Sequence, residues 1–281
     1  MNTVTFTRKT LNVPGANLYY EVRGNGPTLL MMPGGPADAT TFRAIENTLA
    51  ERYAVVTYDP RGLSHSSLEE SIDDARMVEV FADDAYRLID ACADGKADVF
   101  ASSGGASIAL ELVRQHCDRL RMVIFHEPPT PAFLPDGDQV RARMEDVCDT
   151  CAREGIFPAM QKFMALIGIQ GGPPPPPSGE PTPEEREAMG MMQKNLEFYF
   201  GRYIRNIARY EPDLAALRTC SARLVPAVGE ESNGQLAHSG GLGLARALGV
   251  EAIVFPGDHG GFAGRPEPFA AKLLEVLAAR A

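Results

Sequence analysis

Two adjacent serines stand in the segment DVFASSGGASIAL, residues 98–110, between an apolar run and a helix-like stretch. A nucleophilic serine on a sharp strand-to-helix turn needs small residues two positions before and two positions after it, because larger side chains would collide there. Ser103 meets this requirement with Ala101 and Gly105, whereas Ser102 would have a bulky phenylalanine two positions before it. We therefore expect Ser103 to be a nucleophile, although the motif alone also fits a serine-rich helix N-cap.

Two backbone amides could hold the oxyanion that attack by such a serine would form. The first belongs to Gly104, at the start of the following helix, where amide groups point toward a negative charge. The second would come from the glycine pair in MPGGPAD, which directly follows the apolar run 28–32. We expect Gly35 to supply it and keep Gly34 as the fallback, while an ordinary loop remains the alternative for this segment alone.

A general base is expected in the segment PGDHGGF, which follows the apolar run 251–255 near the end of the chain. Its His259 is flanked by glycines, and a base must be an oriented imidazole within hydrogen-bond reach of the serine. His65 and His238 are expected on polar loops. His126 would adjoin the site, with a substrate contact as an open alternative. His259 is therefore the expected base.

The third member of such a site is a carboxylate that orients the imidazole, and the sequence offers two places for it. Glu127 stands in HEPPTP, at the carboxyl end of an apolar run, and the prolines after it would fix its direction. The loop after 223–228 reads VGEESNG, with Ser232 where an aspartate is more common in this architecture. We expect Glu127 to be the acid and keep Glu231 or Glu230 as alternatives.

The elements that must position these residues alternate between strand and helix patterns. Because parallel neighbours need a crossover, the pattern predicts an α/β fold with a mostly parallel eight-stranded sheet and helices on both faces. Ligands then bind at the carboxyl ends of the strands. The expected strands are 3–8, 17–22, 28–32, 54–58, 98–102, 121–126, 223–228 and 251–255. The expected helices of the core are 41–52, 73–94, 104–117, 241–248 and 266–280.

One interval is much longer than the others. Roughly ninety residues separate the sixth expected strand from the seventh, where a crossover usually takes about a third of that. The interval is helical by pattern, and we expect residues 131–212 to form an inserted helical cap on a core of residues 1–130 and 213–281. A Pro-rich stretch at 171–184 is expected to be a mobile loop that gates access to the site. For the whole interval, the alternative is a linker between two independent domains.

The composition excludes several classes of protein. A net charge of -10 argues against nucleic-acid binding, and no apolar run is long enough for a membrane span. The start of the chain lacks the apolar core of a signal peptide. An odd number of scattered cysteines favours reduced thiols in the cytoplasm, and CDTC at 148–151 is expected to be an ordinary helical segment. No metal or organic cofactor is expected, and the oligomeric state stays open, a homodimer included.

With these residues placed, the chain resembles the α/β-hydrolase superfamily. LLMMPGGPADATTF resembles its HGGP-type oxyanion loop, and AVVTYDPRGLSHSS its D-x-R-G stretch, with Asp59 and Arg61 as scaffold. SSGGASIALELVRQHCDRLRMVIFHEPPT is similar to the corresponding region of the fungal zearalenone lactonases, whose acid is a glutamate in an H-E-x-P-T stretch. This resemblance implies a Ser103–His259–Glu127 triad. The chain departs from that family in the cap and in the PGGP loop.

A triad of this kind would hydrolyse a small-molecule carboxylic ester or lactone through an acyl-enzyme. The aromatic segment LEFYFGRYIRNIARY of the expected cap would then line an apolar substrate pocket. A C–C bond hydrolase, or an acyl-transfer or cyclising enzyme of secondary metabolism, could use the same triad. A ligand-binding relative without turnover is the alternative from a different class.

Overall fold

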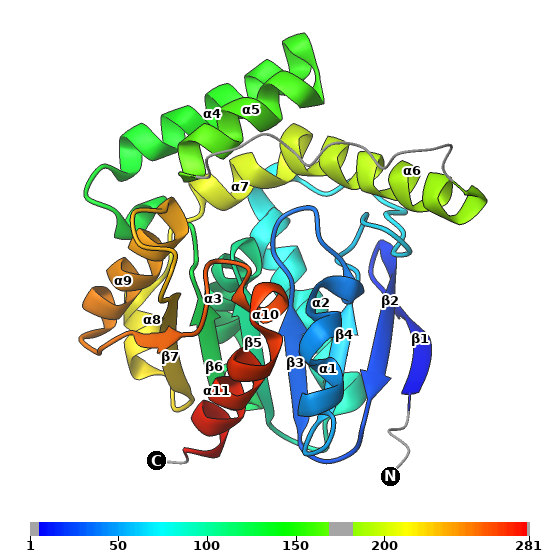
Figure 1. Ribbon diagram of the computed structural model, residues 1–281, viewed down its shortest axis with the longest axis vertical. Helices are drawn as coiled ribbons and strands as arrows, with labels where there is room; N and C mark the ends of the chain where they lie inside the picture. The colour runs from blue at the N-terminus through cyan, green and yellow to red at the C-terminus, as the bar shows by residue number, and fades with distance from the viewer. Residues whose placement is uncertain (1–5, 169–181, 280–281) are drawn as a thin grey trace.

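The computed structural model describes residues 6–168 and 182–279. Within these residues eight strands form one sheet in the order β1-β2-β4-β3-β5-β6-β7-β8 (Figure 1). β2 pairs antiparallel with β1 and with β4, and all other neighbouring strands are parallel. The eight strands are β1 Phe6–Val13, β2 Ala16–Arg23, β3 Thr28–Met32, β4 Ala54–Tyr58, β5 Ala97–Ser102, β6 Leu120–His126, β7 Arg223–Gly229 and β8 Ile253–Phe255. The predicted eight-stranded, mostly parallel sheet is confirmed.

The first strand differs most from its expected position. The sequence predicts a strand at 3–8, whereas β1 extends to Val13 and pairs with β2 along its whole length. Most of its side chains are exposed because β1 is an edge strand, so no apolar alternation marks its second half. A tight turn at Gly15, with φ of 74°, joins it to β2. Residues 3–5 lie outside the described part of the chain.

Helices cover both faces of the sheet. Along β3, Leu29 and Met31 pack with α1 and α11, whereas Leu30 and Met32 face the cluster that contains α2 and α3. A strand with both faces buried reads as a continuous apolar run, which is why TLLMM does not alternate. The helices of the core are α1 Arg43–Leu49, α2 Met77–Cys92, α3 Gly104–His116, α9 Leu236–Leu248, α10 Gly261–Gly264 and α11 Pro266–Ala278.

A group of helices between β6 and β7 lies over the carboxyl ends of the strands (Figure 1). They are α4 Gly137–Glu154, α5 Ile156–Ile167, α6 Pro183–Phe198, the π-helix η5 Tyr199–Tyr203 and α7 Ile204–Arg209. The short helix α8 Leu214–Thr219, which follows them, packs beside the sheet against α3 and α9. The division into core and cap stays a prediction. Of the Pro-rich stretch 171–184, residues 171–181 and their expected gating role lie outside the described residues. Thr182 and Glu185 form a capping box, and α6 begins at Pro183, within the stretch that was expected to be a loop.

Asn195 of α6 joins these helices to the loops of the sheet. Its side chain is 1% exposed, and its Nδ2 donates hydrogen bonds to the Pro36 carbonyl at 3.1 Å and to Ser64 Oγ at 2.9 Å. Its Oδ1 accepts a hydrogen bond from the Ser64 amide at 2.9 Å. One buried amide therefore satisfies three groups on two loops, one of which is the PGGP loop.

The cysteines correct one expectation. Cys117 and Cys220, which are 103 residues apart in the sequence, form a disulfide, so the expectation of reduced thiols was wrong for this pair. Sequence spacing could not reveal it, because the pairing depends on how β6 and β7 bring the two segments together. Cys148 and Cys151 are free thiols within α4, as expected for an ordinary helical segment. A disulfide is more common outside reducing compartments, so a cytoplasmic location stays a prediction.

No helix of the described ranges is long and apolar enough to cross a membrane.

Candidate active site

Ser103 lies between β5 and α3 in a strained backbone conformation, with φ of 55° and ψ of -129°. A non-glycine residue at such φ is uncommon and occurs mainly where the surroundings fix it. The Ser103 amide donates a hydrogen bond to the His126 carbonyl at 2.9 Å. A Cβ at Gly105 would lie 2.4 Å from the Pro33 carbonyl oxygen, so only glycine fits two positions after the serine. This is the geometry of a nucleophile elbow.

The neighbouring Ser102 has a different environment. Its side chain is 3% exposed, and its Oγ lies 3.3 Å from His126 Nδ1. Both serines border one apolar cavity, but only Ser103 has the backbone conformation of a nucleophile elbow. The Ser102 hydroxyl therefore makes a buried polar contact with His126, whereas the Ser103 side chain lies on the strained turn.

The two expected oxyanion donors border the same cavity. Within the described residues, neither the Gly35 amide nor the Gly104 amide donates to a protein acceptor. Gly35 has φ of 63°, which favours glycine. A Cβ at Gly34 would lie 2.5 Å from Ser103 Cβ, so the loop can approach the elbow only because this residue is glycine. The geometry favours Gly35 and Gly104 as donors, with Gly34 required for close approach.

Asp59 and Arg61 hold the loops around this site. Asp59 accepts hydrogen bonds from the Ala39 amide at 2.8 Å and from the His65 amide at 2.9 Å. Arg61 is buried and pairs with Asp84, with Nε to Oδ2 at 2.6 Å. These contacts are structural, as the sequence indicates for this stretch.

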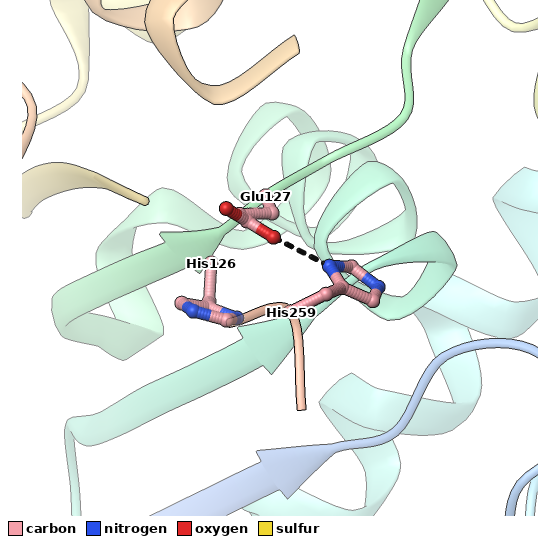
Figure 2. A group of neighbouring side chains, drawn as sticks. All are labelled: His126, Glu127 and His259. Carbon is pink, nitrogen blue, oxygen red and sulfur yellow. Dashed lines mark hydrogen bonds and ion pairs between the residues drawn. The ribbon is translucent and has the colours of Figure 1, made fainter. Parts of the chain in front are cut away.

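Glu127 directly follows β6 and His259 lies in the loop after β8, and their side chains point toward each other (Figure 2). His259 Nδ1 and Glu127 Oε2 are 2.6 Å apart, although the two residues are 132 positions apart in the sequence. Glu127 is fully buried and has φ of 54°, whereas the side chain of His259 is 28% exposed. His259 and Ser103 border the same cavity, and in the described part of the chain no hydrogen bond joins them. The structure thus brings the three expected residues to one place.

The surroundings of Glu127 favour its ionised form. Burial alone would raise the pKa of Glu127, but hydrogen bonds from His259 and Ser232 and the nearby His126 outweigh it and lower the pKa to about 2. The Gly229 amide also donates to Oε1 at 2.9 Å. A carboxylate that stays charged can orient an imidazole and stabilise its protonated form.

The alternative acids lie elsewhere. Glu231 forms an ion pair with Arg265, and Glu230 accepts a hydrogen bond from the Gly257 amide at 3.3 Å. Both side chains are 47% exposed. The geometry therefore favours Glu127 as the partner of His259.

Sequence reasoning missed two residues behind Glu127. Ser232 is fully buried and donates its hydroxyl proton to Glu127 Oε1. His238, expected on a polar loop, lies in the first turn of α9 with Nδ1 at 3.0 Å from Ser232 Oγ. Ser232 at the usual aspartate position was the available signal, but nothing in the sequence connects it to a glutamate on the preceding strand.

His126 is a buried neighbour of this pair and does not border the cavity, contrary to the possible substrate contact. Its ring centroid lies 6.1 Å from that of His259, and its Nε2 has no hydrogen-bond partner among the described residues. Burial lowers the pKa of His126 to about 4, so the ring is neutral near pH 7. His126, Glu127 and His259 could bring potential metal-ligand atoms within 4.8 Å of one another. Glu127 Oε2 and His259 Nδ1, however, already bond each other.

Replacing His126 by phenylalanine is expected to make the free energy of unfolding less sensitive to acid. The folded pKa of about 4 lies below the ordinary 6.5, so the unfolded chain binds the proton more readily between these values. The stability is therefore present in full above pH 6.5 and is lost as the pH falls toward 4. Urea unfolding at about pH 7.5 and about pH 5 should show an acid-induced loss about 2 kcal/mol smaller in the variant. Equal acid-induced losses of stability in the variant and the wild type would contradict the lowered pKa of His126.

An apolar cavity of about 270 Å³ opens at Ser103. Among the described residues its lining contains no Asp, Glu, Lys or Arg side chain. Its larger apolar lining residues are Met144, Phe163, Ile167, Tyr199, Tyr203, Ile204, Ile207 and Phe262. Of the aromatic residues in the expected segment, Tyr199 and Tyr203 line this cavity, whereas Phe198, Phe200 and Tyr210 do not.

The π-helix η5 places Tyr203 against the elbow. A Cβ at Gly104 would lie 3.0 Å from the Tyr203 hydroxyl, so the ring packs directly over that glycine. Tyr199 packs beside it, with ring centroids 5.6 Å apart. π-Helical turns are rare and are frequently found at functional sites.

Comparison with known proteins places this geometry in a family. The model of the alpha/beta hydrolase fold matches residues 27–163. The uncharacterised hydrolase YraK of Bacillus subtilis is 34% identical over 284 residues, which cover 98% of this chain and 97% of that protein. The chain belongs to the α/β-hydrolase family. The zearalenone hydrolase of Bionectria ochroleuca is 28% identical to this α/β hydrolase, over 96% of this chain and 97% of that protein.

The fold of this α/β hydrolase also resembles solved structures. A thermophilic esterase from Thermogutta terrifontis has a TM-score of 0.71 and 21% identity, and the match covers 96% of this chain and 98% of that chain. At this identity the likeness concerns the fold alone. It agrees with the sheet and with the placement of the helices around it.

Proposed function

We propose that this α/β hydrolase cleaves a carboxylic ester or lactone through Ser103, His259 and Glu127. The observation that carries the proposal is the 2.6 Å contact between His259 Nδ1 and the buried carboxylate of Glu127, in a site that shares its cavity with Ser103. A fixed carboxylate, an imidazole and a strained serine are the groups that acyl transfer needs.

In the proposed reaction His259 Nε2 takes the proton of Ser103 as Oγ attacks the acyl carbon. The Gly35 and Gly104 amides stabilise the oxyanion of the tetrahedral intermediate. The protonated His259 then gives its proton to the leaving alcohol oxygen, and Glu127 stabilises the imidazolium meanwhile. Water attacks the acyl-enzyme with His259 as base, which releases the acid and restores Ser103.

The cavity supports a neutral, medium-sized substrate. Its lining is mostly apolar, and a charged substrate group there would find no oppositely charged side chain among the described residues. Tyr199 and Tyr203 offer phenol hydroxyls and aromatic faces next to the elbow. The name of the zearalenone hydrolase, a relative over nearly the whole chain, supports lactones as substrates.

A panel of esters and lactones tests the function and the choice of substrate. We expect kcat/KM for a neutral butyrate ester to exceed that for the matching succinate half-ester by about 10- to 100-fold, because the cavity would bury the extra carboxylate without a partner. The rates should be measured with p-nitrophenol as the common leaving group and with Ser103→Ala as the blank. Equal rates for both esters would contradict the proposed selectivity, and no turnover of any ester or lactone would contradict the function.

A further inference from the structure

Two side chains lie near the Glu127 carboxylate oxygen that does not contact His259, and we infer that Ser232 and His238 are positioning residues for Glu127. This inference rests on the proposed function and deepens it. It concerns the carboxylate oxygen Oε1, which faces away from His259.

Ser232 and His238 reach Oε1 from two different elements. Ser232, in the loop after β7, donates its hydroxyl proton to Glu127 Oε1. Its Oγ also lies 3.0 Å from the Gly229 carbonyl, but a hydroxyl has one proton, and the charged carboxylate is the stronger acceptor. His238 Nδ1 lies 3.0 Å from Ser232 Oγ and 3.5 Å from Glu127 Oε1. An N–H at Nδ1 can thus donate to Ser232 Oγ while that hydroxyl donates to Glu127.

Glu127 needs this support because of where its side chain must reach. It begins at the end of β6 and meets His259 after β8, with β7 between them in the sheet. A glutamate side chain has more rotatable bonds than an aspartate, so its carboxylate is harder to hold in one orientation. The Gly229 amide, at 2.9 Å, and the Ser232 hydroxyl fix Oε1, which leaves Oε2 directed at His259.

These donors also determine how strongly Glu127 attracts a proton on His259. The titratable groups facing Glu127 are His126 from β6, His238 from α9 and His259 itself. The nearby Glu230 and Glu231 bond to the Gly257 amide and to Arg265 instead. Without the Ser232 hydroxyl, more negative charge would reside on Oε2 and protonated His259 would be favoured. The acidic limb of the pH profile should then move to higher pH.

The test compares Ser232→Ala with Ser239→Ala on p-nitrophenyl butyrate. Ser239 lies on α9 and donates to the Gln235 carbonyl at 3.2 Å, so it is a matched serine outside this network. We expect Ser232→Ala to lower kcat about 10- to 100-fold with little change in KM, since a hydrogen bond to a charged group is lost. The midpoint of the acidic limb of kcat/KM should rise by about half a pH unit. Ser239→Ala should match the wild type in both measurements.

His238 supplies a second pair of variants that does not depend on the folding of Ser232→Ala. His238→Asn can keep an N–H donor near the Nδ1 position and should retain kcat within about threefold, whereas His238→Leu removes the donor and should lose about tenfold. Active sites are counted by fluorophosphonate titration of Ser103, so unfolded protein does not contribute to kcat.

The outcomes separate the two claims. Wild-type kcat and an unmoved acidic limb in both Ser232→Ala and His238→Leu would overturn the inference, even where Ser103→Ala and Glu127→Gln are inactive. A wild type that neither turns over esters or lactones nor reacts with the fluorophosphonate would overturn the proposed function, and the inference with it.

Discussion

Replacing Ser103 by alanine is expected to lower kcat for ester hydrolysis by about 10⁴- to 10⁶-fold and to abolish labelling by a fluorophosphonate. The variant keeps the oxyanion donors and the cavity but has no oxygen to form the acyl-enzyme. Residual hydrolysis would come from oriented water alone. Steady-state kinetics on p-nitrophenyl butyrate and mass spectrometry of the labelled protein measure the two effects.

Ser102→Ala is the matched control for this prediction. The two serines are adjacent in the chain, but only Ser103 has the elbow φ of 55°. The Ser102 variant should still be labelled, with the adduct on Ser103. Labelling that survives in Ser103→Ala and disappears in Ser102→Ala would show that the nucleophile has been assigned to the wrong serine.

Replacing Glu127 by glutamine is expected to lower kcat by about 10³- to 10⁴-fold while the fold is retained. The glutamine is nearly isosteric, so the contacts of Gly229 with the side-chain oxygen can persist. The substitution removes the charge that stabilises protonated His259, and an amide NH₂ facing Nδ1 would favour the wrong tautomer of the imidazole. The decrease should appear in kcat more than in KM, because the charge matters most once the imidazolium forms.

Glu231→Gln is the comparison that decides between the two carboxylates. Glu231 is half-exposed and pairs with Arg265, so its substitution should leave kcat within about twofold, as is usual for an exposed ion pair. A large loss in Glu231→Gln together with normal turnover in Glu127→Gln would reverse the assignment of the acid. Circular dichroism of both variants controls for unfolding.

The parts of the site that could be predicted from the sequence depend on local rules. The elbow follows from the small residues around Ser103, and the end of β6 places Glu127 among the loops at the carboxyl edge of the sheet. The continuous apolar runs indicate parallel strands because both faces of such strands are buried, as for β3. Each of these inferences needs only a short segment and the general geometry of an α/β sheet.

The parts that could not be predicted depend on contacts between distant segments. The pairing of Cys117 with Cys220 and the bond between Ser232 and Glu127 arise only once β6 and β7 are side by side. His238 looked like a loop residue because its helix contains three glycines, which lower intrinsic helix propensity. The extent of β1 is determined by pairing with β2, so its exposed residues give no periodic signal.

The three hydrogen bonds of Asn195 make the covering helices and the PGGP loop mechanically interdependent. If α6 swings away from the sheet, it must either break these bonds in a buried setting or take Pro36 and the adjacent glycines along with it. In the second case the amide of Gly35 would leave its place beside the serine. The proposed oxyanion donor at Gly35 would therefore be in position only while α6 stays packed on these loops.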